Sequence, residues 1–252
     1  MTAERRRPVV AANWKMNFLK ADAAEYCRTL RRHLAAMGTP ARTVVFPSFP
    51  LLPMVARELV ATEVAVGGQD LHPEDRGAFT GDVSGRQLSD AGCSWALCGH
   101  SERRRDHHES DDLVGRKVAA AERCGLTALL CVGESREQRR AGRALQVLER
   151  QLRAGLAARP ESFAVAYEPV WAIGTGETAT PAAAQEAHEH LRRVLAELMG
   201  EEIAAVAPIL YGGSVTPETA AGLIAEPDVD GFLVGGASLD PQKFLAIIRH
   251  SG

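Results

Sequence analysis

The amino-acid sequence predicts an α/β fold, a single closed (β/α)8 barrel with eight parallel strands and outer helices. Short apolar runs recur along the 252 residues, and each is followed by a longer segment of helical period. This alternation is typical of a parallel sheet with crossover helices. No linker, low-complexity segment or charge block divides the chain. We therefore expect one domain over residues 1–252.

Eight apolar runs bounded by turn residues are expected to form the strands. In chain order they are Val9–Ala12, Thr43–Phe46, Val64–Gly67, Trp95–Cys98, Ala128–Val132, Phe163–Tyr167, Pro208–Leu210 and Gly231–Val234.

Helical period predicts the longer helices between these strands. They are Ala21–Met37, Asp111–Cys124, Arg143–Leu156, Pro181–Met199 and Pro241–His250. Thr180, Thr216 and Asp240 each precede a proline, which is the arrangement of an N-cap residue before a proline at the first helical position. These signals indicate where three helices begin.

The composition argues against several classes of function. The chain has 29 basic and 32 acidic residues, so we expect no basic surface for nucleic acid. No apolar run reaches the roughly 18 to 20 residues of a membrane span, and the run after Arg5–Arg7 is too short for a secretory signal. The five cysteines lack a CxxC pair, which indicates buried thiols in a reducing cytosol. We expect a cytoplasmic protein without a nucleic-acid or membrane partner.

Polar residues follow most of the predicted strands directly. In a parallel barrel the active site forms at the C-terminal ends of the strands, so these residues are the candidates for chemistry. They are Asn13 and Lys15 after the first strand, His100 and Glu102 after the fourth, Glu134 after the fifth, Glu168 after the sixth, Gly212–Ser214 after the seventh, and Gly235–Gly236 after the eighth.

Glu168 is the candidate general base. It lies between a strand and the apolar segment Pro169–Trp171, and apolar neighbours raise the proton affinity of a carboxylate. The alternative is a structural glutamate paired with an arginine at the barrel rim.

His100 and Lys15 are candidates for stabilising negative charge. An imidazole that faces a helix N-terminus is hard to protonate, so His100 can donate a hydrogen bond as a neutral acid. Lys15 is the only one of four lysines at the mouth end of a predicted strand. The alternatives are a structural histidine and an ordinary loop lysine.

The two glycine pairs, with Ser214, lie where barrels commonly bind phosphate through main-chain N–H groups, although glycine pairs also form simple tight turns. Glu134 is expected to be a structural hydrogen-bond partner. The pairs His107–His108 and His188/His190 lack the spacing of a zinc site, and Gly174–Gly176 lacks dinucleotide-binding spacing. We expect neither a metal nor a cofactor.

The segments at the strand ends resemble, in order, those of the triosephosphate isomerase family over essentially the whole chain. The matching motifs are Ala12–Asn17, Gly77–Gly81, Gly99–Arg104, Cys131–Glu134, Tyr167–Gly176, Tyr211–Val215 and Gly231–Leu239. The resemblance implies a cofactor-free isomerase of glycolysis and gluconeogenesis. Such an enzyme interconverts dihydroxyacetone phosphate and D-glyceraldehyde 3-phosphate through an enediolate.

The resemblance also implies individual roles. Glu168 would be the base, His100 the electrophile that polarises the carbonyl, and Lys15 the cation that stabilises the intermediate and the phosphate. Glu102 would position Lys15, and Asn13 would contact the substrate.

Further roles follow at the phosphate end and at the lid. The phosphate would rest on main-chain N–H groups of Gly174, Ser214, Gly235 and Gly236. Ile173 and Leu233 would form an apolar clamp over the base. Residues 169–178 would form a lid that closes on the phosphate. Thr80 would lie in a loop that enters a neighbouring subunit, which implies a homodimer.

Three residues depart from the usual family pattern: Asp70 in place of asparagine, Cys98 in place of an aliphatic residue, and Glu177 in place of a basic one. None removes a catalytic group. Two alternatives remain open, namely an isomerase acting on a four-carbon sugar phosphate and a non-catalytic sugar-phosphate sensor that kept the barrel.

Overall fold

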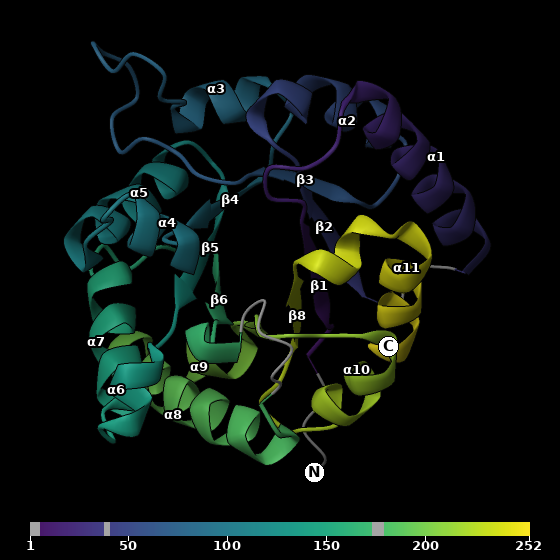
Figure 1. Cartoon of the computed structure of the whole chain (residues 1–252). Helices are drawn as coiled ribbons and strands as arrows, with labels where there is room; N and C mark the ends of the chain where they lie inside the picture. The colour runs from purple at the N-terminus through teal and green to yellow at the C-terminus, as the bar shows by residue number, and fades with distance from the viewer. Residues whose placement is uncertain (1–5, 38–40, 173–178) are drawn as a thin grey trace.

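The computed structural model describes residues 6–37, 41–172 and 179–252, and within them eight parallel strands form a closed barrel in sequence order (Figure 1). β1 pairs with both β2 and β8, which closes the ring. The predicted fold class is confirmed, and each predicted strand matches the observed one to within one residue at either end. The strands are β1 (Val9–Asn13), β2 (Arg42–Phe46), β3 (Ala65–Gly68), β4 (Trp95–Cys98), β5 (Thr127–Val132), β6 (Phe163–Tyr167), β7 (Ile209–Tyr211) and β8 (Gly231–Val234).

Helices surround the barrel as an outer ring (Figure 1). The five long ones confirm the predictions: α1 (Lys20–Met37), α5 (Asp111–Arg123), α7 (Ala144–Gly155), α8 (Pro181–Met199) and α11 (Pro241–His250). The shorter ones are α2 (Leu52–Leu59), α3 (Gly85–Asp90), α4 (Ser101–Asp106), α6 (Arg136–Arg140), α9 (Glu201–Val206) and α10 (Pro217–Ile224). Three 3-10 helices are η1 (Phe49–Leu51), η2 (Val170–Ala172) and η3 (Gly236–Leu239). Among the described residues no helix is long and apolar enough to cross a membrane.

The predicted helix starts are formed by side-chain caps. The Thr180 hydroxyl accepts the Ala183 N–H, and the Asp240 carboxylate accepts the N–H groups of Gln242 and Lys243. Thr216 makes a capping box with Thr219. Each cap satisfies main-chain donors that have no partner within the helix.

Alternating side chains of each strand divide the apolar core into two layers. In β1, Val9 and Ala11 point into the barrel, whereas Val10 and Ala12 pack against the helices. Trp95 and Phe46 are the largest side chains of the inner layer. Because the interior is filled in this way, the barrel is a solid scaffold whose open space lies at its mouth.

An ion-pair cluster supports the end of the barrel opposite the mouth, where β7, β8 and β1 begin. Arg192 of α8 binds Asp228 at 3.0 Å and Asp230 at 2.5 Å. The Asp230 carboxylate also accepts the N–H of Ile209, and its main-chain oxygen accepts that of Val9. This cluster holds the seam at which the ring closes.

Candidate active site

The strand ends converge on one cavity of about 640 Å³ at the C-terminal mouth of the barrel. Ten of the residues predicted for the site line it: Asn13, Lys15, His100, Glu168, Gly212, Gly213, Ser214, Leu233, Gly235 and Gly236. Glu102 lies beside them and binds Lys15. Ile173 and Gly174 lie outside the described residues, as does Glu177.

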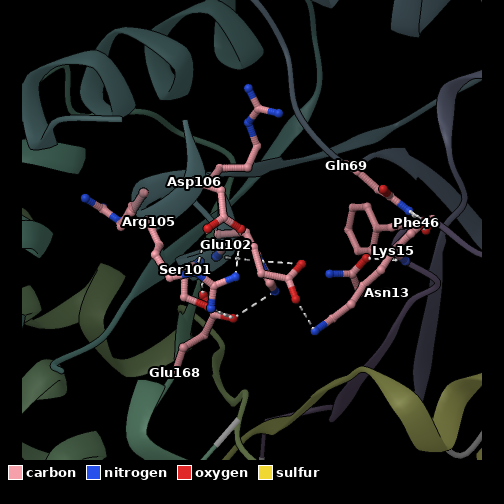
Figure 2. Close-up of polar contacts among 12 residues, drawn as sticks. Asn13, Lys15, Phe46, Gln69, Ser101, Glu102, Arg105, Asp106 and Glu168 are labelled. Carbon is pink, nitrogen blue, oxygen red and sulfur yellow. Dashed lines mark hydrogen bonds and ion pairs between the residues drawn. The ribbon is translucent and has the colours of Figure 1, made fainter. Parts of the chain in front are cut away.

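Glu168 is buried at the end of β6, with 2% of its surface exposed. Its Oε2 accepts the main-chain N–H of Ser101 at 2.9 Å, and its Oε1 lies 3.3 Å from the Ser101 hydroxyl and 3.0 Å from Nε2 of His100. Figure 2 shows Glu168 directed at the start of α4, where Ser101 lies. Glu168 is therefore held against His100 and the N-terminus of α4.

The expected rise in the proton affinity of Glu168 was wrong for this arrangement. Burial raises the pKa of the carboxyl group, but the charge and hydrogen bond of His100 and the Ser101 N–H lower it, and the net direction is down. The sequence neighbours of Glu168 are apolar, whereas its neighbours in space are donors that stabilise the carboxylate.

His100 is the N-cap residue of α4, and its Nδ1 accepts the main-chain N–H of Glu102 at 3.2 Å. When the imidazole is neutral, the nitrogen that accepts this hydrogen bond carries no proton, so the one proton lies on Nε2, which faces Glu168. Burial lowers the pKa of His100, but Glu168 raises it, and the net direction is upward. The expected suppression of protonation is thus outweighed by Glu168 while the two side chains touch.

Lys15 lies across the cavity mouth from Glu168, and its Nζ is 2.7 Å from Oε1 of Glu102 (Figure 2). Its backbone has φ of 52°, a left-handed conformation that costs a non-glycine residue about 1–3 kcal/mol. Two hydrogen bonds hold it there: its N–H donates to Oδ1 of Asn13 at 3.0 Å, and its carbonyl accepts from Nε2 of Gln69 at 2.8 Å. These bonds maintain a strained backbone conformation at Lys15, and that conformation orients its ammonium group.

The glycine pairs form the far wall of the cavity. Gly236 begins η3, and the first N–H groups of a helix lack acceptors within it, so they are free for an anion. Gly213 has a steric requirement, because a Cβ at this position would lie 2.2 Å from the Tyr211 hydroxyl oxygen. Only glycine lets the chain after β7 pass so close to the buried Tyr211 side chain.

Glu134 has the structural role predicted for it. It is fully buried, and its Oε1 accepts from Nε1 of Trp171 at 2.8 Å and from the Tyr167 hydroxyl at 3.2 Å. Its main-chain oxygen accepts the Val170 N–H at 3.2 Å. These bonds fix η2, the segment that directly precedes residue 173.

Thr80 lies away from the cavity lining of its own chain. It is exposed in the loop that projects from the barrel between β3 and α3 (Figure 1). In the same loop Phe79 stacks on His72 with ring centroids 3.9 Å apart and remains 42% exposed. Met16, after β1, is 94% exposed.

Two of the three unusual residues lie within the described structure. Asp70 joins an ion cluster in which it binds Lys117 at 2.5 Å and Arg103 at 2.9 Å. Cys98 is fully buried, and three of the other four cysteines are also buried, whereas Cys124 is only partly buried. The described residues contain no cluster of three or more side chains that could hold a metal ion.

Two residues that matter to the site were missed at the level of sequence. Ser101 supplies two donors to Glu168, and Gln69 holds the main chain of Lys15. The position of Ser101 at the first turn of a helix is a signal that could have identified it, because its N–H has no partner in the helix. Gln69 carries no comparable signal.

Comparisons with known proteins agree with this geometry. A family model described as triosephosphate isomerase matches residues 8–251. The chain is 47% identical over 251 residues to the triosephosphate isomerase of Thermus thermophilus, covering 98% of this chain and 100% of that one. It is 49% identical over 254 residues to that of Xanthobacter flavus, covering 100% of both chains.

Proposed function

The chain belongs to the triosephosphate isomerase family, and from this membership we propose which of its residues carry the reaction. The enzyme interconverts dihydroxyacetone phosphate and D-glyceraldehyde 3-phosphate by proton transfer through an enediolate, in glycolysis and gluconeogenesis. The observation that best supports the assignment is the meeting of Glu168, His100 and Lys15 at one cavity.

Glu168 is the base that removes the carbon-bound proton. For this step its carboxylate leaves Ser101 and His100 and turns toward the cavity that it already lines. Once those donors are lost, burial becomes the dominant influence and the pKa of Glu168 rises. A carboxylate that gains proton affinity on meeting the substrate is a stronger base there than in the free enzyme.

His100 is the electrophile and Lys15 is the cation. When Glu168 moves away, the larger of the two influences that raise the pKa of His100 is removed and only the charge of Glu102 remains. Burial, the charge of Lys15 and the Glu102 N–H then keep the imidazole neutral. Its Nε2–H can then donate to the substrate carbonyl. Glu102 positions the Lys15 ammonium group, and Asn13 contacts the substrate while it holds the Lys15 main chain.

The phosphate end is formed by main-chain N–H groups of Ser214, Gly235 and Gly236, together with Gly174. Leu233 lines the cavity beside them and, with Ile173, forms the apolar clamp over the base. Residues 169–178 form the lid, with η2 as its N-terminal hinge. Closure excludes water and retains the enediolate until the second proton transfer.

The active form is a homodimer of single-domain subunits in the cytoplasm. The loop around Thr80 projects from the barrel and exposes Phe79, and Met16 is exposed after β1. Large exposed apolar side chains such as these are typical of an interface between subunits. Light scattering at decreasing concentration tests the dimer, and a monomer with full activity would contradict it.

An isomerase assay on glyceraldehyde 3-phosphate tests the catalytic assignment. We expect Glu168→Gln to lower kcat by about 10²–10⁴-fold, which is the contribution typical of a positioned base. Glu189→Gln removes the same charge from an exposed position on α8 and should leave kcat unchanged. A folded Glu168→Gln protein with full activity would disprove the role of the base. Higher turnover of a four-carbon sugar phosphate would instead support the longer substrate.

A further inference from the structure

The outer wall of the catalytic cavity contains a second lysine that the proposed mechanism does not use. Lys243 lines the cavity together with Thr216, Pro217, Glu218 and Leu239, beyond the glycine pairs of the proposed phosphate cradle. It lies in the first turn of α11, which packs against α10. The chain has 25 arginines but only four lysines, and two of those four line this cavity.

The charge on Lys243 is available to an incoming anion. Within the described part of the chain the Nζ of Lys243 makes no ion pair, whereas Lys15 and Lys117 are both paired with carboxylates. The nearby carboxylate of Asp240 accepts main-chain N–H groups at the start of α11. Lys243 is exposed, so its ammonium group can meet the substrate before the substrate enters the cavity.

Glu218 is the opposing charge on the same wall. It lines the cavity at the start of α10 and is exposed. The Thr216 side chain lowers the pKa of Glu218, and the positive charge of Lys243 contributes to this in a smaller degree. The two residues are therefore close enough for their charges to interact, and Glu218 is the side chain that weakens the field of Lys243.

We propose that Lys243 captures the phosphate dianion at the rim of the cavity and directs it to the glycine cradle. The inference rests on the proposed placement of the phosphate at that cradle. The protein has a formal net charge of −3, so a doubly negative substrate is repelled at long range. A local positive charge at the mouth offsets this repulsion and raises the rate of productive encounter. Lys15 lies deeper and binds Glu102, so it contributes less to the field outside the cavity.

Steady-state kinetics at two ionic strengths test this role. At about 10 mM salt the screening length is roughly 30 Å, and at about 1 M it is roughly 3 Å. We expect Lys243→Glu to lower kcat/KM for glyceraldehyde 3-phosphate by about threefold to tenfold at low salt, with kcat unchanged. Lys243→Gln should lower it by less, and Glu218→Gln should raise it. At high salt all the variants should match the natural enzyme.

Lys20→Glu is the matched control. It makes the same change of charge at an exposed lysine that does not line the cavity, at the first residue of α1. We expect it to leave kcat/KM within twofold of the natural value. The loss in Lys243→Glu would then be due to the position of the changed charge and not to the change in net charge.

Two results would overturn the inference. One is equal kcat/KM for the Lys243→Glu and Lys20→Glu proteins at low salt, and the other is a loss in Lys243→Glu that persists at 1 M salt. Either result would leave the proposed function standing, because kcat in both proteins would remain high, in contrast to the loss expected for Glu168→Gln.

Discussion

The position of the Glu168 carboxylate depends on a residue with no side chain. A Cβ at Gly133 would lie 1.8 Å from the main-chain oxygen of Glu168, well inside van der Waals contact. The Gly133 N–H is in turn held by Oε1 of Gln151 at 2.7 Å, so the chain after β5 has little freedom to retreat. The end of β6 is therefore seated directly against the end of β5.

We predict that Gly133→Ala displaces Glu168 and lowers kcat by about 10²-fold, since a shift of about 1 Å at a reacting group has that effect. The assay on glyceraldehyde 3-phosphate measures kcat, and circular dichroism checks that the protein is folded. A folded variant with natural kcat would contradict the prediction.

Gly222→Ala is the matched control. Gly222 lies within α10, and a Cβ there would be 3.9 Å from its nearest neighbour, Pro181. It should preserve kcat and raise the free energy of unfolding by about 0.5–1 kcal/mol, because alanine loses less backbone entropy than glycine in a helix.

At the scale of single residues, the sequence indicated which side chains meet. It was misleading about the direction in which the pKa of Glu168 is shifted. Glu168, His100 and Lys15 could be brought together because each lies within two residues of the end of a strand, and strand ends share one face of a barrel. The lowered pKa of Glu168 could not be predicted, because it arises from His100 and from a main-chain N–H on another element. A contact with a main-chain group, such as that of Gln69 with the Lys15 carbonyl, cannot be predicted from the order of side chains along the sequence.

The elements themselves were predictable where they were long. Strands buried on both faces have continuous apolar runs, and amphipathic helices such as α8 have a clear period and a capped start. The short helices α2, α3, α6 and α9 were not predicted, because five to eight residues span too few turns to establish a period. Tertiary contacts help to specify them, since α2 packs against β3, α6 against α7 and α9 against α8.

The residue that follows the proposed lid is attached to β7. The hydroxyl group of Tyr211 accepts the Ala179 N–H at 3.3 Å, directly after residues 173–178. Both residues are buried, so without this bond the N–H would lose its acceptor at a cost of about 1–3 kcal/mol. The bond fixes the chain directly before the N-cap of α8.

We predict that Tyr211→Phe lowers kcat about tenfold, because 1.4 kcal/mol lost from the closed lid corresponds to a factor of ten. Tyr26→Phe is the control: its hydroxyl is buried on α1 and does not line the cavity, so kcat should not change. Equal kcat for the two variants in the isomerase assay would disprove the role of the Tyr211 hydroxyl.

For the molecule as a whole, His188 couples folding to pH. It is fully buried on α8, and its Nδ1 lies 3.1 Å from the Asp228 carbonyl oxygen, within the cluster at the barrel seam. Burial lowers the pKa of His188 to about 4. Between pH 6.5 and 4 the unfolded chain binds a proton that the folded protein excludes, so folding becomes less favourable as the pH falls.

The predicted loss from this one residue is on the order of 3 kcal/mol over that range. His188→Asn can keep a donor to the Asp228 carbonyl but does not titrate. Urea denaturation at pH 7.5 and 4.5 should therefore show a smaller loss of unfolding free energy in the variant than in the natural protein. Equal losses would mean that His188 does not contribute to acid sensitivity.

The closure of β8 onto β1 has a consequence for assembly. Each of the eight strands has a neighbour on both sides, so the barrel of the described structure offers no unpaired strand edge. Exposed edges are the templates on which sheets of different molecules join and aggregate. Copies of this protein must therefore associate through loops and helices. A change that opens the β8–β1 seam would expose two unpaired strand edges at once, one on each strand.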